Sequence, residues 1–513
     1  MPVLPEAAEK RPTRTTSCSE YLNMRINNQA ALVSHGNVNG RKIVTELLDA
    51  GLDAIDPYYR VKKLVRVEDG KIKLNTVGFE MKGDPHSGSI AFDLKDYDRV
   101  FVIGAAKGIQ RAALGFEEAL GDVLTAGHVI AKHGEAIICK KIGVTLAGHP
   151  VPDVCCVEGC RKIEALISGL TARDLVFTVF GSGCGSLLTY PTEGISIDDV
   201  ADFTRMMQIE KGVVTGELNQ IRTHIDRFKG GRLLRMLMPA TVVNTVTADP
   251  SKTDTPIVRV GYFDMLRVNT FFPTVATAST FGDCIEIIKR HDAWERTPAS
   301  IQKRLLCGGD ADENMRIAEY EHLGCRFFGL IFKDATVYLA VRERAESLGV
   351  ECVMLSEYTQ AEAREAGFVD AAIALCSERS GEPFGTPVVL MSSGENVVTV
   401  GLESGVGGRN QEYCVAAATR IAGSKQIVIG AVDTDGTDGP GGFCHPGAPE
   451  CLAGAVVDGE TVAEAKRAGI DLTEALKTHG TSEPLWRLNC GVDAKSNVSA
   501  LDLRIIYIGE KTE

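Results

Sequence analysis

The sequence predicts the α/β fold class, with a mainly parallel sheet in a large N-terminal part and a smaller α/β part behind it. Three observations indicate this. The segments VFVIGAAKG, HVIAKHG and DLVFTVFGSG are each typical of a buried strand that ends at glycine. The first continues into the helical pattern IQRAALGFEEAL, as the opening of a βαβ unit does. The chain also has 513 residues, which is too long for one typical core.

The other elements of the first part follow from apolar spacing and turn residues. We expect disorder over 1–20 and helix from Tyr21 to Pro57, followed by a hairpin that turns at Asp69 and Gly70, because Asp-Gly suits a tight turn. Beyond the three strands, the pattern predicts a helix over 212–236 broken at the glycine pair Gly230-Gly231, a strand over ATVVNTVTA, helices between 275 and 320, and helix then strand over YLAVRERAESLGVECVML.

A second region begins near residue 385. PVVLMSSGENVVTVGL alternates and predicts sheet with hairpin character. KQIVIGAVDTDGTDGP predicts a strand that ends in an acidic loop, and LDLRIIYIG predicts a last strand. We therefore assign 21–340 to a first domain and 385–510 to a second one.

Composition narrows the class of function. The formal net charge is −13 with no basic stripe, which argues against nucleic acid as a partner but leaves anionic small molecules open. No apolar run is long enough to span a membrane. Fifteen scattered cysteines without an apolar leader favour a reduced, cytoplasmic setting, and CCVEGC (155–160) lacks the spacing of a zinc site. A homodimer is compatible with the sequence.

The first candidate for chemistry is Lys107, in the glycine turn that ends VFVIGAAKG. A strand, a glycine turn and a helix form the place where α/β proteins hold phosphates or carboxylates. The turn has neither the G-x-G-x-x-G fingerprint of dinucleotide-binding folds nor a Walker loop. The alternative is a solvated surface lysine.

A second glycine turn, SGCGS (182–186), also follows a strand. Small residues there let a ligand approach backbone N–H groups. The turn is not a G-x-S-x-G nucleophile elbow, which weakens a hydrolase interpretation. Cys184 is expected to be a small buried residue rather than a nucleophile.

The segment NQIRTHIDRFKGGRLL gathers polar and cationic side chains beside a glycine pair. Asn219, Arg222, His224 and Lys229 lie at helical spacings of three to five, a pattern that suits an anionic substrate. An ordinary basic surface helix is the alternative.

The acidic loop DTDGTDGP contains Asp433, Asp435 and Asp438 directly after a strand. Closely spaced carboxylates suit a hard cation such as Mg²⁺ or general-base work on a hydroxyl, whereas the simpler alternative is an acidic turn. The loop is not a calcium loop, because Cys444 stands where the glutamate at position 12 belongs.

The stretch SGVGGRNQEY (404–413) places long polar side chains where a glycine loop becomes a helix. Free N–H groups at a helix start suit an anion, and Arg409 adds a forked cation. The alternative is a glycine turn before a capped surface helix.

Seven motifs in order give a resemblance to a known family. They are VFVIGAAKG, AGHPVPD (147–153), SGCGSLL, NQIRTHIDRFKGGRLL, SSGENVVTV, GVGGRNQE and TDGTDGP. On them the chain, from about 25 to about 508, resembles the type II glycerate kinases, the glycerate 2-kinase family with a MOFRL C-terminal domain. The resemblance implies transfer of phosphate from ATP to the 2-hydroxyl of D-glycerate with Mg²⁺. It also implies a cleft between a large Rossmann-like domain and a smaller α/β domain of MOFRL type.

The resemblance assigns roles to residues. It implies that Lys107 and Arg409 are needed for catalysis and that Asn410 and Glu412 organise the loop around Arg409. From the acidic loop itself we expect Asp435 to be a metal ligand or base. Asp433, Asp435 and Asp438 are the expected Mg²⁺ ligands. The residues expected to bind substrate or phosphate are Gly104, Ser182, Gly183, Gly185, Ser186, Asn219, Arg222, Lys229, Gly230, Gly231, Arg232, Glu395, Gly407, Gly408, Asn410 and Glu412.

Departures from the family pattern concern ligand-facing loops. They are Cys184 within the SGCGS turn, Asp226 before the Lys-Gly-Gly, HGTS at 479–482, and GVDAKSNVSALDL, which keeps Asn497, Val498 and Asp502. They leave open a related hydroxy acid or sugar acid as substrate. The sequence also leaves open which domain holds the nucleotide. Two other functions stay open as well: an oxidoreductase of the hydroxypyruvate reductase type using a nicotinamide cofactor, and a non-catalytic homologue that binds a sugar acid or nucleotide.

Overall fold

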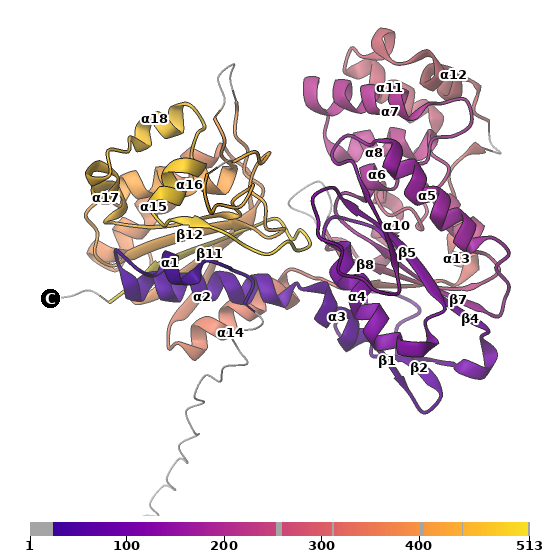
Figure 1. The fold of residues 1–513 in the computed structure, drawn as a ribbon, viewed down its shortest axis with the longest axis horizontal. Coiled ribbons are helices and arrows are strands. Elements are labelled where there is room, and N and C mark those ends of the chain that lie inside the picture. Colours follow the sequence, from indigo (N-terminus) through magenta and orange to yellow (C-terminus); the bar gives the residue numbers. More distant parts are fainter. Residues whose placement is uncertain (1–23, 253–258, 310–311, 401–404, 444, 511–513) are drawn as a thin grey trace, which may run out of the picture.

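The computed structural model describes residues 24–252, 259–309, 312–400, 405–443 and 445–510. The predicted disorder over 1–20 lies outside these residues. Two α/β lobes stand side by side (Figure 1). Within the described part, no helix is long and apolar enough to cross a membrane, and the thirteen cysteines are free.

The first lobe is built on a six-stranded sheet whose neighbouring strands all run parallel, as the sequence predicted. In spatial order the strands are β6 (Gly143–Ala147), β5 (Ala126–Lys132), β4 (Arg99–Ala105), β7 (Asp174–Phe180), β8 (Thr241–Val246) and β9 (Arg326–Gly329). Every residue of β7 is buried, because helices cover both faces of the sheet. This explains why its sequence, DLVFTVF, is almost continuously apolar.

Helices of this lobe carry the turns of interest at their N-terminal ends. The lobe contains α3 (Pro57–Leu64), α4 (Ile109–Leu120), α5 (Val154–Ile167), α6 (Cys184–Leu187), α7 (Ile197–Thr204), α8 (Thr215–His224), α9 (Arg232–Leu237), α10 (Tyr262–Val268), α11 (Phe281–Arg290), α12 (Ala299–Cys307) and α13 (Ile317–Leu323). The predicted helix over 212–236 is therefore two helices, α8 and α9. They are separated at Ile225, earlier than the glycine pair, because Asp226 binds the backbone of the loop between them.

The predicted hairpin is confirmed. Strands β1 (Val65–Glu68) and β2 (Lys71–Leu74) pair antiparallel, and β3 (Ile90–Asp93) joins them. Asp69 and Gly70 both adopt positive φ, which the tight two-residue turn between right-twisted strands requires.

The second lobe contains a mixed six-stranded sheet. In spatial order its strands are β10 (Glu351–Thr359), β11 (Val388–Gly394), β15 (Asp502–Ile508), β12 (Ile427–Asp433), β13 (Gly454–Asp458) and β14 (Gly491–Val492). Its helices include α1 (Gln29–Leu32), α2 (Val38–Ala54), α14 (Leu339–Ser347), α15 (Ala363–Ser380), α16 (Arg409–Arg420), α17 (Thr461–Arg467), α18 (Leu472–Lys477) and α19 (Ser482–Arg487). Helix α2 packs against β12 and β15 from one face, and α16 covers β12 and β13 (Figure 1).

The prediction of a hairpin within PVVLMSSGENVVTVGL is wrong. This segment supplies one fully buried strand, β11, which pairs with β10 and with β15. It lies inside a sheet covered by helices and is buried on both faces, so the apparent alternation of its sequence did not indicate a hairpin. The second lobe also includes α2 and β10, because their apolar faces pack with its sheet although they precede residue 385 in the chain.

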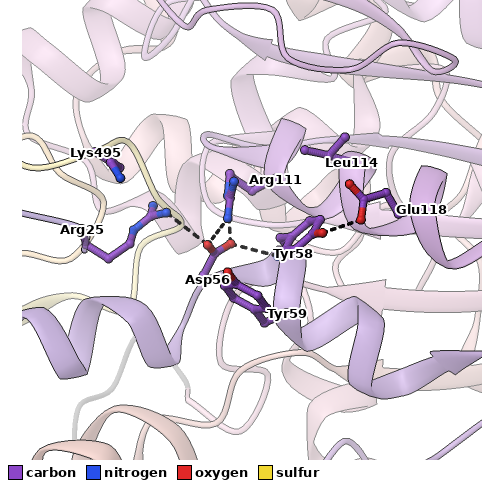
Figure 2. A pocket seen from close by; sticks show the side chains of 8 residues that line it. All are labelled: Arg25, Asp56, Tyr58, Tyr59, Arg111, Leu114, Glu118 and Lys495. Carbon is purple, nitrogen blue, oxygen red and sulfur yellow. Dashed lines mark hydrogen bonds and ion pairs between the residues drawn. The ribbon is translucent and has the colours of Figure 1, made fainter. Parts of the chain in front are cut away.

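A buried carboxylate ties the N-terminal segment to the first lobe. Asp56 caps α3, and its carboxylate accepts from Arg25 Nη1 at 3.1 Å and from Arg111 Nε at 3.0 Å. Arg25 in turn accepts a backbone hydrogen bond from Lys495 of the second lobe. Figure 2 shows the two arginines converging on Asp56 beside a cavity of about 270 Å³. The two arginines share the Asp56 carboxylate, and Arg25 Nη2 also donates to the Ser496 carbonyl at 2.7 Å, so this junction is a structural joint between the lobes.

Candidate active site between the lobes

Lys107 and Asp435 meet across the two lobes. Lys107 lies just beyond β4 and Asp435 just beyond β12, and Nζ of the lysine donates to Oδ2 of the aspartate at 2.5 Å. The Lys107 side chain keeps 23% exposure, whereas Asp435 is buried. The sequence predicted one site that combines cations of the first region with carboxylates of the second. In the structure Lys107 and Asp435 lie together at the junction of the two lobes.

Electrostatics hold this pair ionised. Burial alone would lower the pKa of Lys107, but Asp435 and Asp433 outweigh it and raise that pKa. Burial would likewise raise the pKa of Asp435, but Lys107 and Thr437 hold it below its usual value. The pair therefore offers a charged ammonium and a charged carboxylate at neutral pH.

The glycine turn around Lys107 is packed tightly. A Cβ on Gly104 would lie 1.9 Å from the Val179 carbonyl oxygen, so this glycine allows β4 and β7 to approach each other. Gly108, with φ of +64°, donates its N–H to Glu135 Oε1 at 3.0 Å. A carboxylate of the protein therefore occupies the start of α4, where the glycine turn alone had suggested a phosphate.

The SGCGS turn lies directly against Lys107. The backbone N–H of Lys107 donates to the Ser182 carbonyl at 2.8 Å. A Cβ on Gly183 would come within 2.9 Å of Lys107 Cγ and 3.1 Å of His149 Cδ2. Cys184 is buried, and burial raises the pKa of its thiol to about 12, so it is not poised as a nucleophile.

Arg222 is buried behind the same turn with unused donors. Its Nη1 donates to Asn219 Oδ1 at 3.2 Å, and both side chains lie within 3.2 Å of the position that a Cβ on Gly185 would take. Within the described part of the chain, Nε and Nη2 of Arg222 have no hydrogen-bond partner. Burial lowers the pKa of Arg222 to about 10. The Ser186 hydroxyl donates to the Gly148 carbonyl at 3.0 Å.

The rest of the NQIRTHIDRFKGGRLL segment is engaged with its own loop. Lys229 Nζ donates to the Leu188 carbonyl at 2.6 Å and to Asp226 Oδ2 at 2.7 Å. Arg232 Nη2 donates to the Asp312 carbonyl at 2.6 Å. A Cβ on either glycine of the pair would clash with Asn314 or Met315; these glycines are Gly230 and Gly231. The segment is buried, and its contacts are those of a structural loop that holds Arg222.

In the second lobe, sheet register gathers the carboxylates. Asp502 at the start of β15 lies opposite Asp433 at the end of β12 and opposite Gly394 at the end of β11. Arg409 lies over this edge, where its Nε donates to Asp502 Oδ1 and its Nη2 to Asp433 Oδ2, both at 2.8 Å. Glu395 Oε1 is 3.7 Å from Arg409 Nη1, so Nη1 is the nitrogen with the weakest partner.

Asp438 caps helix α16 instead of facing the other acidic residues of its loop. Its Oδ1 accepts from the backbone N–H of Asn410 at 3.1 Å and its Oδ2 from that of Gln411 at 2.9 Å. Burial raises the pKa of Asp438 to about 6, although Arg409 and these N–H groups counter the rise. Asp438 therefore neutralises the free N–H groups of the helix start.

The glycine loop before α16 is packed against two other loops. A Cβ on Gly407 would lie 2.5 Å from the His479 carbonyl, and one on Gly408 would lie 2.2 Å from the Asp438 carbonyl. Glu412 accepts from His479 Nδ1 at 2.7 Å, and Asn410 Nδ2 donates to Asp502 Oδ1 at 2.9 Å. Residues of the GGRNQE motif thus fix the loop that presents Arg409.

The predicted Mg²⁺ ligands do not form one ready-made cage. Asp438 is engaged by the helix, Asp433 is paired with Arg409, and Asp435 with Lys107. Burial, together with repulsion from the neighbouring Asp435 carboxylate, raises the pKa of Asp433 well above its usual value. Within the described residues, the ligand-type atoms that gather within 4.8 Å belong to another group: His133, Asp153 and Cys155.

Comparisons with known proteins give the family. A family model described as "Domain of unknown function (DUF4147)" matches residues 43–306, and one described as "MOFRL family" matches 388–495. A glycerate 2-kinase of Pyrococcus horikoshii is 31% identical over 453 residues, which are 87% of this chain and 92% of that protein. The chain belongs to the type II glycerate kinases.

Structure agrees with sequence on membership of the type II glycerate kinases. A crystal structure of glycerate kinase from Thermotoga maritima is similar with a TM-score of 0.70 at 25% identity, covering 91% of this chain and 99% of that one. A relative in Agrobacterium vitis that is 30% identical, over 80% of this chain and 87% of that protein, carries the name putative hydroxypyruvate reductase. The fold and the enzyme class predicted from the motifs are confirmed.

Two side chains near this junction, Glu135 and Lys333, were not singled out from the sequence, and a third, Asp502, was named only as a retained residue without a role. Asp502 lay within a quoted motif, and its pairing with Arg409 needed the register of β15. Glu135, which occupies the start of α4, follows a strand in an unremarkable KHGEA segment. Lys333 lies near Asp502 and Glu395, is 2% exposed and has no hydrogen-bond partner for Nζ among the described residues. Nothing in its local sequence, IFKDA, marks it.

Proposed function

We propose that this protein transfers the γ-phosphate of ATP to the 2-hydroxyl of D-glycerate, giving 2-phosphoglycerate and ADP. The observation that carries the proposal is the contact of Lys107 with Asp435 across the lobes, at 2.5 Å. Phosphoryl transfer needs a cation for the moving phosphate and a carboxylate for the proton of the acceptor hydroxyl, held close together. The two groups come from separate lobes, so a substrate bound between the lobes would meet both.

The proposed step uses these two groups in turn. The 2-hydroxyl oxygen of the acid forms the new bond to the γ-phosphorus, and the bond from that phosphorus to the β-bridging oxygen breaks. Asp435 accepts the hydroxyl proton, and Lys107 neutralises charge on the phosphate oxygens. The low pKa of Asp435 is set by Lys107, so the carboxylate becomes a better base once the ammonium turns to the phosphate.

Two arginines would fix the substrates. Among the residues that the structure describes, two buried donors of Arg222 beside the SGCGS turn have no partner, and a phosphate or carboxylate there would satisfy them. Arg409 donates Nε to Asp502 and Nη2 to Asp433, so Nη1 is the nitrogen that remains for the hydroxy-acid substrate. We propose that Arg409 binds the carboxylate of the hydroxy acid through Nη1.

We propose that Mg²⁺ arrives with the nucleotide phosphates rather than at a protein cage. Mg²⁺ commonly takes one or two protein carboxylates and completes its shell with phosphate and water. In this chain the three candidate aspartates are already paired with a cation or a helix start. Mg²⁺ without nucleotide should therefore bind weakly in a titration, and Mg²⁺ with ATP should bind well.

A cytoplasmic location and a homodimer stay proposals.

Steady-state kinetics with ATP and D-glycerate test the catalytic roles. Lys107→Ala and Arg409→Ala should lower kcat/KM by roughly a hundredfold or more, the range for a group that stabilises transition-state charge. Lys63→Ala, which changes an exposed lysine on α3, is the matched control and should keep full activity. Near-normal turnover by Lys107→Ala in the folded protein would remove the assignment.

The name of the Agrobacterium relatives makes a reductase the second candidate. Against it, the Glu135 carboxylate accepts the hydrogen bond from the Gly108 N–H. In dinucleotide-binding folds the N–H groups at this helix start bind the pyrophosphate of the cofactor. The rate of NADH oxidation in the presence of hydroxypyruvate separates the two functions. Oxidation of NADH at a rate comparable to ATP turnover would favour the reductase.

A further inference from the structure

Three metal-binding side chains converge at the carboxyl end of strands β5 and β6. They are His133, which directly follows β5, Asp153, which is the N-cap of α5, and Cys155, which lies in the first turn of that helix. One ligand atom from each residue lies within 4.8 Å of the other two. The His133 Nε2 and Asp153 Oδ2 atoms are already 2.7 Å apart. The glycerate kinase chemistry proposed above uses none of these three side chains.

The three groups are held by rigid parts of the fold. The backbone N–H of His133 donates to the Ala147 carbonyl at 3.0 Å, which fixes it to the end of β6. Asp153 Oδ1 accepts from the Cys156 N–H at 3.3 Å, so only Oδ2 faces His133. The His133 side chain is 52% exposed and that of Asp153 37%, so an ion from solvent can reach them.

The donor set selects the kind of ion. An imidazole nitrogen, a carboxylate oxygen and a thiolate sulfur suit a borderline or soft divalent ion, whereas Mg²⁺ and Ca²⁺ prefer oxygen alone. Three protein ligands with one open position form the usual arrangement of an accessible zinc site. The 2.7 Å between His133 Nε2 and Asp153 Oδ2 is shorter than the separation of two ligands that each lie about 2.0 to 2.3 Å from one Zn²⁺ ion, so binding needs a small outward rotation of these exposed side chains.

We propose that His133, Asp153 and Cys155 bind a thiophilic divalent ion of the Zn²⁺ class, with water in the fourth position. The ion takes the place of the proton between His133 and Asp153, and the thiol proton of Cys155 passes to solvent. No electron transfer is involved. The carboxylate and thiolate charges balance the charge of the ion.

The position of this site couples it to the cleft. A Cβ on Gly148 would lie 3.0 Å from Asp153 Cγ, and the Gly148 carbonyl accepts from Ser186 of the SGCGS turn. His149, the next residue, and Lys107 both lie beside Gly183 of that turn. An ion that draws Asp153 outward would therefore shift this turn and reduce turnover. This second consequence rests on the proposed kinase function, whereas ion binding does not.

Direct binding of Co²⁺ and Zn²⁺ to the purified protein tests the site. Wild type should show one equivalent of bound ion, with the thiolate-to-Co²⁺ charge-transfer absorption that a cysteine ligand gives. Cys155→Ser should lose that absorption, and Cys155→Ser and His133→Asn should each weaken Zn²⁺ binding roughly tenfold or more. Cys307→Ser and Cys376→Ser, which change exposed cysteines elsewhere, are the matched controls and should bind as wild type does.

Other outcomes would overturn the site. Equal Zn²⁺ affinity of wild type and Cys155→Ser, loss of binding in a control variant, or no stoichiometric binding at all would each reject it. Turnover measured with and without Zn²⁺ then tests the coupling separately. Inhibition in wild type but not in Cys155→Ser is expected; a protein that binds Zn²⁺ but shows no kinase activity would contradict the proposed function and leave the ion site standing.

Discussion

Lys333 offers a stability test that the structure makes quantitative. This lysine precedes the π-helix Asp334–Tyr338, is 2% exposed, and has no partner for Nζ among the described residues. Burial and the neighbouring Lys252 lower its pKa to about 7, against the pull of Asp249, Asp502 and Glu395. Replacing it by methionine, Lys333→Met, keeps an unbranched stem and removes the buried charge.

The expected gain follows from the displaced pKa. A fall from the ordinary 10.5 to about 7 corresponds to a cost of about 5 kcal/mol when the group is protonated in both states. Below pH 7 both the folded and the unfolded chain are protonated, so the full cost applies. Between pH 7 and pH 10.5 the unfolded chain holds more protons, so wild-type stability rises with pH in this window. After allowance for relaxation, Lys333→Met should be more stable by on the order of 3 kcal/mol at pH 6.

Thermal unfolding of both proteins from pH 6 to pH 9 checks this. We expect a higher Tm for Lys333→Met at pH 6 and a gap that narrows as pH rises. Lys333→Arg is the control, because arginine cannot give up its proton and should gain nothing. A gap that is constant with pH, or a variant less stable than wild type at pH 6, would refute the account of an unpaired buried cation.

Three further substitutions separate structural roles from binding roles. Gly104→Ala should lower the free energy of unfolding by about 3 kcal/mol or more, and Tm with it, because the new Cβ meets the Val179 carbonyl at 1.9 Å; an unchanged melting curve would show that the strands can move apart. Arg222→Met should raise KM for one substrate roughly tenfold with little change in Tm, because two of its nitrogens have no partner to lose within the described part of the chain; unchanged kinetics would remove it from the site. Asp438→Ala should cost about 1 to 2 kcal/mol by uncapping α16 and leave the Mg²⁺ dependence of turnover unaltered; a shifted Mg²⁺ dependence in the folded variant would make it a ligand instead.

The sequence predicted the parallel sheet well because its signal is local. Buried strands ending at glycine and followed by a helical pattern occur at β4 and β7, and both lie at the centre of the first sheet. The mixed second sheet was harder. Its order places β15, the last strand of the chain, between β11 and β12, and no local pattern encodes that pairing.

The same distinction applies to the site. Lys107, Arg409 and Asp435 could be named because motifs in order mark them, and the structure brings them to neighbouring positions at the lobe junction. Local composition alone could not separate Arg222, whose donors are unused, from Lys229 and its partners, because both belong to one basic segment. That difference depends on which carbonyl groups the folded loop supplies.

The most direct test of the central claim is the product of the reaction, followed by ³¹P NMR with ATP, Mg²⁺ and D-glycerate. If Asp435 and Lys107 act together at the lobe junction, the enzyme should phosphorylate the hydroxyl group next to the carboxylate of D-glycerate. The account predicts ADP and 2-phosphoglycerate in equal amounts, and neither from Lys107→Ala. Formation of 3-phosphoglycerate, or ADP without a phosphorylated acid, would contradict it.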